Sequence, residues 1–115
     1  MPGDLFGIHG AALQLRSQRM GVLASNIANA GTPGYKARDI DVTAALARMQ
    51  GGSNADQAAD GATLFRVPVI ASLDGNTVEL QNEQIAFSEN AVGYAATLDL
   101  IRGRVETVTR AIRGE

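Results

Sequence analysis

The sequence predicts an all-α fold in which two long terminal helices pack as an antiparallel coiled coil around an extended, irregular middle. Apolar residues recur at heptad spacing near both ends of the chain, and the middle is rich in glycine, proline and small polar residues. At 115 residues the chain is expected to form a single domain. Its parts are an N-terminal helix over 1–30, a turn, extended arm and loop over 31–76, and a C-terminal helix over 77–115.

The N-terminal helix, expected from about Asp4 to Ala30, carries two apolar rows with a seven-residue repeat. The first row is Phe6, Leu13, Met20 and Ile27, and the second is Ile8, Leu15 and Val22. The offset of two residues places the rows on nearly opposite sides of a helix. A helix that is apolar on two sides needs a partner on each. We therefore expect one row to face the C-terminal helix and the other to face a different molecule.

The N-terminal helix is expected to end in a tight turn that leads into an extended arm. Asn29 and Gly31 suit the left-handed conformation that often ends a helix. The segment Thr32–Tyr35 fits a type II turn, with proline in its second position and glycine in its third. The following residues alternate in polarity up to Arg38, as an extended segment does. The residues of this turn motif are Asn26, Asn29, Gly31, Thr32, Pro33, Gly34 and Tyr35.

The middle of the chain contains one short helix and allows a short strand pair. Asp41 can cap a helix over Val42–Met49, which the glycines after it would stop. Residues 51–62 are small, polar and glycine-bearing, and predict a flexible loop. Leu64–Ile70 has strand composition, but Pro68 restricts it to an edge or an irregular extension.

The C-terminal helix, expected over Thr77–Arg113, has the clearest periodicity in the chain. A helix-packing seam repeats at alternating intervals of four and three residues: Phe87, Ala91, Tyr94, Leu98, Ile101, Val105, Val108 and Ile112. Asn76 followed by Glu79 predicts a capped start. Because this helix is the longer one, its first residues, from Val78 to Phe87, are expected to extend beyond the N-terminal helix.

Two stretches carry a resemblance to a known family. The sequence ASNIANAGTPGYKARDID over Ala24–Asp41 resembles the N-terminal signature of the bacterial axial family, the flagellar rod, hook and hook-associated proteins. The continuation ARDIDV and the later SLDGNTVELQNEQIAFSENAVGYAATLDLIRGR, from Ser72, resemble the rod component nearest the membrane. The resemblance covers residues 1–48 and 72–115, and it does not extend to the segment between them.

The resemblance implies a structural subunit of the flagellar basal-body rod. The expected assembly is a helical tube of packed terminal helices that transmits torque and encloses the export channel. The implied partners are other copies of the chain, other rod and basal-body proteins, and the flagellar export apparatus, without nucleic acid or a small-molecule substrate. The implied location is the periplasmic rod, reached without a cleaved signal peptide; the first ten residues also have no signal-peptide pattern.

Neither the composition nor the motifs indicate an enzyme, a metal site or a cofactor. His9 is the only histidine and the chain has no cysteine, so neither a catalytic dyad nor a transition-metal site is expected. The net charge of -2 gives no basic patch for nucleic acid. Three alternatives remain at this point: another rod-type axial protein, a cytosolic helical adaptor or coiled-coil protein, and a peripheral membrane helix. Two apolar rows without an opposing basic face disfavour the last.

Overall fold

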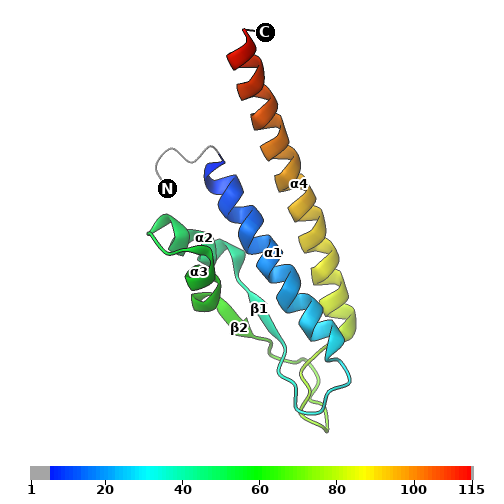
Figure 1. The fold of residues 1–115 in the computed structure, drawn as a ribbon. Coiled ribbons are helices and arrows are strands. Elements are labelled where there is room, and N and C mark those ends of the chain that lie inside the picture. The colour runs from blue at the N-terminus through cyan, green and yellow to red at the C-terminus, as the bar shows by residue number, and fades with distance from the viewer. Residues whose placement is uncertain (1–5, 115) are drawn as a thin grey trace.

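The computed structural model describes residues 6–114 and is mostly helical, with one small antiparallel strand pair (Figure 1). The elements in chain order are α1 (Gly7–Ala28), β1 (Arg38–Ile40), α2 (Val42–Gln50), α3 (Ala55–Gly61), β2 (Thr63–Phe65) and α4 (Leu80–Arg113). The two long terminal helices of the prediction are confirmed. The first residues of the expected N-terminal helix, up to position 5, lie outside the described part of the chain.

The helices α1 and α4 lie side by side and run in opposite directions (Figure 1). With 22 and 34 residues they are about 33 Å and about 51 Å long, at roughly 1.5 Å per residue. The predicted position of the overhang, at Val78–Phe87, is wrong. Contacts at the turn hold the end of α1 level with the start of α4, so the C-terminal end of α4 extends past α1 instead. The molecule is therefore elongated, with extents of 65 × 26 × 18 Å.

Leu15 and Val22 of the second apolar row of α1 pack against the middle of the same chain, so the prediction that this row needs a different molecule is wrong for these two residues. Leu15 is fully buried in a core cluster with Ile40, Ala45, Ala58, Ala59 and Ala62. Val22 packs against the same cluster. Sequence reasoning missed this because alanine supplies most of the middle's contribution, and alanine gives only a weak hydrophobic signal.

The segment predicted as a flexible loop, 51–62, contains the helix α3. Asn54 accepts a hydrogen bond from the backbone N–H of Gln57 at 2.8 Å, and the Gln57 side chain accepts one from the backbone N–H of Asn54 at 3.2 Å. This reciprocal capping box satisfies two backbone donors at the helix start. The helix α2 agrees with its prediction to within one residue, and the Asp41 side chain caps it by accepting from Ala44 N–H at 3.0 Å.

The strand pair is short, with three residues in each strand. The register pairs Arg38 with Phe65 and Ile40 with Thr63. Of the predicted strand segment Leu64–Ile70, only the first two residues pair within the sheet. One further bond, from Arg66 N–H to the Ala37 carbonyl at 2.9 Å, precedes Pro68.

Both helix ends at the turn differ from their predicted caps. Neither Asn29 nor Gly31 has a positive φ, so the expected left-handed cap is absent. The amide of Asn76 instead donates to the carbonyls of Asn29, Ala30 and Thr32 at 2.9, 3.1 and 2.7 Å. Asn76 therefore closes α1 and does not cap α4, which begins at Leu80 after Glu79, without a side-chain cap.

Candidate functional site

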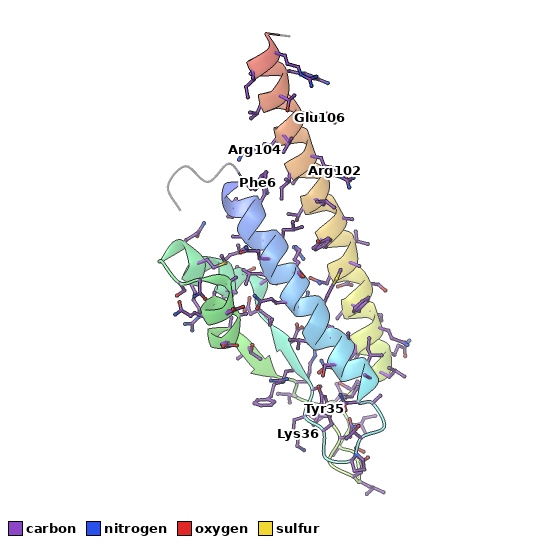
Figure 2. The ribbon with its side chains drawn as sticks, viewed as in Figure 1. Phe6, Tyr35, Lys36, Arg102, Arg104 and Glu106 are labelled. Atoms are coloured by element: carbon purple, nitrogen blue, oxygen red, sulfur yellow. The ribbon has the colours of Figure 1, made fainter. Side chains whose placement is uncertain are left out.

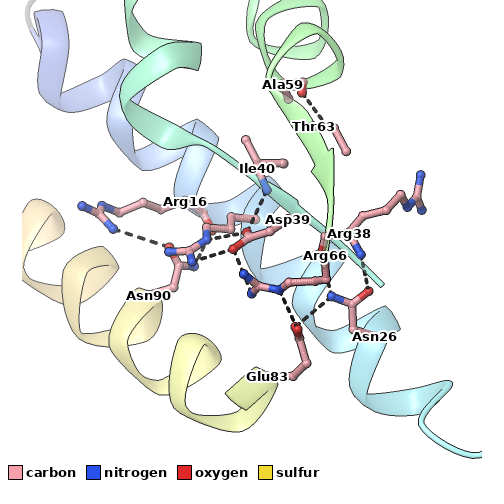
Figure 3. Close-up of polar contacts among 11 residues, drawn as sticks. Arg16, Asn26, Arg38, Asp39, Ile40, Ala59, Thr63, Arg66, Glu83 and Asn90 are labelled. Carbon is pink, nitrogen blue, oxygen red and sulfur yellow. Dashed lines mark hydrogen bonds and ion pairs between the residues drawn. The ribbon is translucent and has the colours of Figure 1, made fainter. Parts of the chain in front are cut away.

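Asn26 is the centre of a polar cluster where α1, the arm and α4 meet (Figure 3). Its side chain is fully buried. The amide nitrogen donates to the Arg38 carbonyl at 2.6 Å and to Glu83 Oε2 at 2.8 Å. The amide oxygen accepts from the Arg38 backbone N–H at 3.1 Å and from the Tyr35 hydroxyl at 3.3 Å. One side chain thus positions both the arm and the start of α4 against α1.

An ion-pair chain continues from Asn26 across the strand pair (Figure 3). Glu83, with 1% of its side chain exposed, accepts from Arg66 Nε at 2.7 Å. Arg66 also pairs with Asp39 at 3.0 Å. Arg19 of α1 binds both oxygens of Asp39, at 2.7 and 2.9 Å. We call these four charged residues, together with Asn26, the polar joint.

The charges of the polar joint balance, so burial does not leave an unpaired ion. Two arginines meet two carboxylates, and each carboxylate has more than one donor. The hydrogen bond to Asp39 raises the pKa of Arg19 above its usual value, although burial acts in the opposite direction. Removing one partner of a buried ion pair destabilises the fold strongly, because the other charge then stays buried without compensation.

A second polar contact ties α4 to the middle of α1. Asn90, fully buried, donates to the Arg16 carbonyl at 2.8 Å and accepts from Arg16 Nη1 at 3.5 Å. A Cβ at Gly93 would lie 2.6 Å from Arg16 Nη1, so the glycine makes room for this guanidinium. The buried polar residues Glu83, Asn90 and Thr97 are seven residues apart. They form a buried polar column on α4 that hydrophobic periodicity could not reveal.

The predicted helix-packing seam lies beside this polar column and is buried only in part. Phe87, Ala91, Tyr94 and Leu98 are half-buried, and Ile101 is buried. The remaining seam residues lie on the overhang and are exposed: 40% for Val105, 36% for Val108 and 81% for Ile112. The first row of α1, consisting of Phe6, Leu13, Met20 and Ile27, is half-buried throughout, while Ile8 of the second row is half exposed.

The turn motif joins α1 to the loop that precedes α4. The Tyr35 N–H donates to the Thr32 carbonyl at 3.2 Å and Gly34 has φ 74°, as the predicted turn requires. Gly34 N–H donates to the Asp74 carbonyl at 2.9 Å, and Thr77 N–H donates to the Tyr35 carbonyl at 2.9 Å. The turn therefore docks on residues 74–77, a contact that the sequence did not predict.

Across positions 6–114 no group of three or more potential ligands could hold a metal ion. Within the same range no helix combines the length and apolarity needed to cross a bilayer. An open groove of about 1210 Å³ lies between α1, the α2–α3 region and α4, lined by residues that include Leu13, Met49 and Tyr94.

Comparison with known proteins places this sequence in a family. The profile of the family described as flagella basal body rod protein matches residues 6–36, which span α1 and the turn. The flagellar basal body rod protein FlgB of Cereibacter sphaeroides is 46% identical, over 97% of this chain and 96% of its own length. The FlgB proteins of Aeromonas hydrophila and Escherichia coli are 39% and 38% identical, over 96% and 89% of this chain and 93% and 88% of their own lengths.

The chain belongs to the FlgB family of flagellar rod proteins. It is a structural subunit of the flagellum and is located in the basal-body rod. The match to the rod-protein family profile begins at Phe6, the first described residue, and ends at Lys36, one residue after the turn motif. The polar joint lies mostly outside that match, since Asp39, Arg66 and Glu83 follow it in the chain.

In this FlgB family member, substitution of Gly34 should destabilise the turn more than substitution of Pro33. A β-branched residue at Gly34 must adopt a positive φ, which destabilises by roughly 1–3 kcal/mol. Pro33→Ala loses only the preset φ of the turn and should destabilise by under about 1 kcal/mol. We expect urea unfolding of the purified chain to rank Gly34→Val below Pro33→Ala in stability.

Gly31→Val is the matched control for this prediction. At Gly31, as at Gly34, an added Cβ would meet nothing within 4 Å, but the φ of Gly31 is not positive. The control should therefore behave close to the wild-type chain. If Gly31→Val and Gly34→Val were equally destabilised, the positive φ would not explain the need for glycine in this turn.

Proposed function

We propose that this chain builds the wall of the flagellar rod through its terminal helices, in a helical tube that transmits torque and encloses the export channel. The observation that carries the proposal is the elongated pair of α1 and α4, whose packing seam continues past α1 into solvent. Val105, Val108 and Ile112 lie on that exposed continuation. Apolar side chains in register with a buried seam are typical of a surface that a neighbouring subunit covers.

The antiparallel packing of α1 and α4 supports a coiled-coil arrangement in the assembled rod. In the isolated chain the centre of the contact is the buried polar column, and most of the heptad seam lies at its edge. A seam that is half-covered by α1 leaves its other half for a helix of a neighbour. We therefore infer that neighbouring subunits cover the parts of the seam and of the first row of α1 that remain exposed in one chain. In this arrangement the chain assembles as a single domain.

The partners that fit this role are other copies of the chain and other rod and basal-body proteins. A subunit with two different ends makes heterologous contacts, which extend into open helical assemblies. Export through the flagellar export apparatus without signal cleavage follows from the axial family resemblance. The role needs no cofactor, nucleic acid or small-molecule substrate, and we propose a mechanical and not a catalytic function.

Deletion of the gene tests the proposed function. We expect the deletion strain not to swim and to assemble no rod, hook or filament, because the missing subunit interrupts the axial structure. Electron microscopy of isolated basal bodies and a soft-agar motility assay measure this outcome. Expression of the chain from a plasmid should restore both. A deletion strain that still carries complete hooks would refute the proposal.

A further inference from the structure

The apolar pattern of α1 and α4 does not by itself fix how far one helix extends along the other. The first row of α1 repeats every seven residues, from Phe6 to Ile27. The seam of α4, from Phe87 to Ile112, also repeats every seven residues. Sliding α4 by one heptad, about 10 Å at roughly 1.5 Å per residue, would therefore place apolar residues opposite apolar residues again. We call this second arrangement the shifted register.

The length of α4 leaves room for the shifted register. The helix has 34 residues, against 22 in α1, and its part after Ile101 forms the overhang. Phe6 lies at the start of α1, and Glu106 lies on α4 beyond the level that α1 reaches (Figure 2). In the shifted register α1 would cover the first part of the overhang, including Val105 and Val108. Apolar burial alone therefore does not exclude the shifted register.

The middle of the chain is attached to α1 and would move with it. The core cluster around Leu15 joins α1 to the middle, and among the described residues it includes none from α4. Arg19 of α1 binds Asp39, and Asn26 bonds to the backbone of Arg38. Among the helices and strands, α4 packs mainly on α1. Its start has no side-chain cap, so the first turns can unwind when the helix slides.

The contacts of Glu83 distinguish the two registers. In the observed register this carboxylate accepts from Asn26 at 2.8 Å and from Arg66 at 2.7 Å. In the shifted register Asn90, one heptad later, would take the place of Glu83. A neutral amide cannot compensate the charge of Arg66, which would keep only Asp39 as its ionic partner. The observed register is therefore favoured at this end of the helix pair.

The surroundings of Arg16 distinguish the registers a second time. Its carbonyl accepts from Asn90 at 2.8 Å, and Gly93 makes room for its guanidinium. One heptad further, Thr97 would replace Asn90, but the Thr97 hydroxyl already donates within α4, to the Gly93 carbonyl at 2.9 Å. Leu100 would replace Gly93, and its side chain would fill the space that the guanidinium needs.

The contact between Arg16 and Asn90 is poorly suited to stability alone. Arg16 Nε is buried and has no hydrogen-bond partner among the described residues, and Nη1 lies 3.5 Å from Asn90 Oδ1. A buried donor without a partner destabilises a fold. In helix pairs, however, a single buried polar residue often selects one register at a cost in stability. Selection of the register explains why such a contact occurs here.

We propose that Glu83 and Asn90, together with Gly93, fix the register of α4 on α1 and exclude the shifted register. The observed register keeps the overhang clear of the α1 of its own chain, so the apolar side chains of the overhang remain available to another molecule. Without these contacts both registers should be populated. The inference concerns a single chain and is tested on the purified protein, so its failure would leave the proposed rod function standing.

Double electron–electron resonance between two spin labels tests the register directly, because the chain has no cysteine of its own to interfere. The labels are attached at Ser17→Cys on α1 and Glu106→Cys on the overhang, both exposed positions. The otherwise unchanged chain should give a single distance. A chain that also carries Glu83→Leu and Asn90→Leu should give a second distance, up to about 10 Å shorter, because the overhang then slides toward α1.

Excess unlabelled chain confines the signal to label pairs within one molecule. The matched control carries Gln81→Leu and Ser88→Leu, two exposed positions on α4 with the same spacing of seven residues, and should keep the single distance. A single, unchanged distance in a helical Glu83→Leu and Asn90→Leu chain would overturn the proposal. If that chain did not fold, Asn90→Leu alone should show the second distance at a smaller amplitude, and its absence there would overturn the proposal equally.

Exchanging the side chains at positions 93 and 100 tests the direction of the selection. Gly93→Leu with Leu100→Gly, added to the Glu83→Leu and Asn90→Leu chain, leaves room for Arg16 only in the shifted register. The shorter distance should then become the major one. An unchanged ratio of the two distances, or a ratio that moves toward the longer one, would refute the role of Gly93 in the selection.

Discussion

Replacing Glu83 by alanine is expected to destabilise the chain by about 3 kcal/mol, at the lower end of the range for breaking a buried ion pair. Glu83 is buried and receives hydrogen bonds from Arg66 at 2.7 Å and from Asn26 at 2.8 Å. Its removal leaves a guanidinium and a buried amide without their acceptor. Arg66 retains Asp39 and partial solvent contact, which is why we expect a value at the lower end.

Urea unfolding of the purified chain, followed by circular dichroism, measures this loss. Glu83→Gln keeps the shape and one acceptor oxygen and should fall between the wild type and Glu83→Ala. Glu106→Ala, which removes an exposed glutamate on the same helix, should change stability little. Equal stability of Glu83→Ala and Glu106→Ala would mean that the polar joint does not hold α4 in place.

Asn26→Leu is the second substitution with a large expected effect, again about 3 kcal/mol, because it leaves several buried groups without partners. The four hydrogen bonds of Asn26 satisfy the Arg38 backbone, Glu83 and the Tyr35 hydroxyl. Leucine has a similar volume but cannot replace these bonds, and each unsatisfied buried group destabilises by roughly 1–3 kcal/mol. Some of these unsatisfied groups can bind water instead, so the total loss of stability is smaller than the sum of the individual losses.

The expected result has a structural part as well as a loss of stability. The arm and the turn should separate from α1, so backbone amides from Tyr35 to Ile40 should exchange with solvent faster in Asn26→Leu. Asn82→Ala, which changes an exposed asparagine on α4, is the matched control and should leave exchange unchanged. Unchanged protection of the arm in Asn26→Leu would show that strand pairing alone holds it.

The effects of Glu83→Ala and Asn26→Leu should not add, because the two side chains contact each other. The double variant should lose less stability than the sum of the single variants, since one shared hydrogen bond is then counted once. This behaviour would distinguish a connected polar joint from two independent sites.

Hydrophobic periodicity predicted the long helices correctly but could not predict how they face each other. The seam from Phe87 to Ile112 correctly identified a continuous helix. The residues at the centre of the α1 contact, Glu83 and Asn90, are polar, and their partners lie 57 and 74 positions away. A pattern of apolar residues carries no information about such distant polar pairs.

Local capping chemistry was readable in some places and ambiguous in others. Asp41 was identified correctly because it directly precedes an apolar helical segment. The pair Asn54 and Gln57 forms an equally good capping box, but the alanines and glycines around it suggested a loop. Asn76 lies where the sequence predicts an N-cap for the C-terminal helix. Its side chain instead donates to three carbonyls at the end of α1, because the tertiary fold brings them close to it.

A density map of basal bodies isolated from the cell tests the central claim most directly. The account predicts that α1 and α4 of this chain lie antiparallel in the wall of the rod, beside the central channel, with Glu83 against Asn26 in each copy. It also predicts that the end of α4 beyond Ile101 is covered by a neighbouring subunit. A map that places the chain outside the rod wall, or separates α1 from α4, would contradict the account.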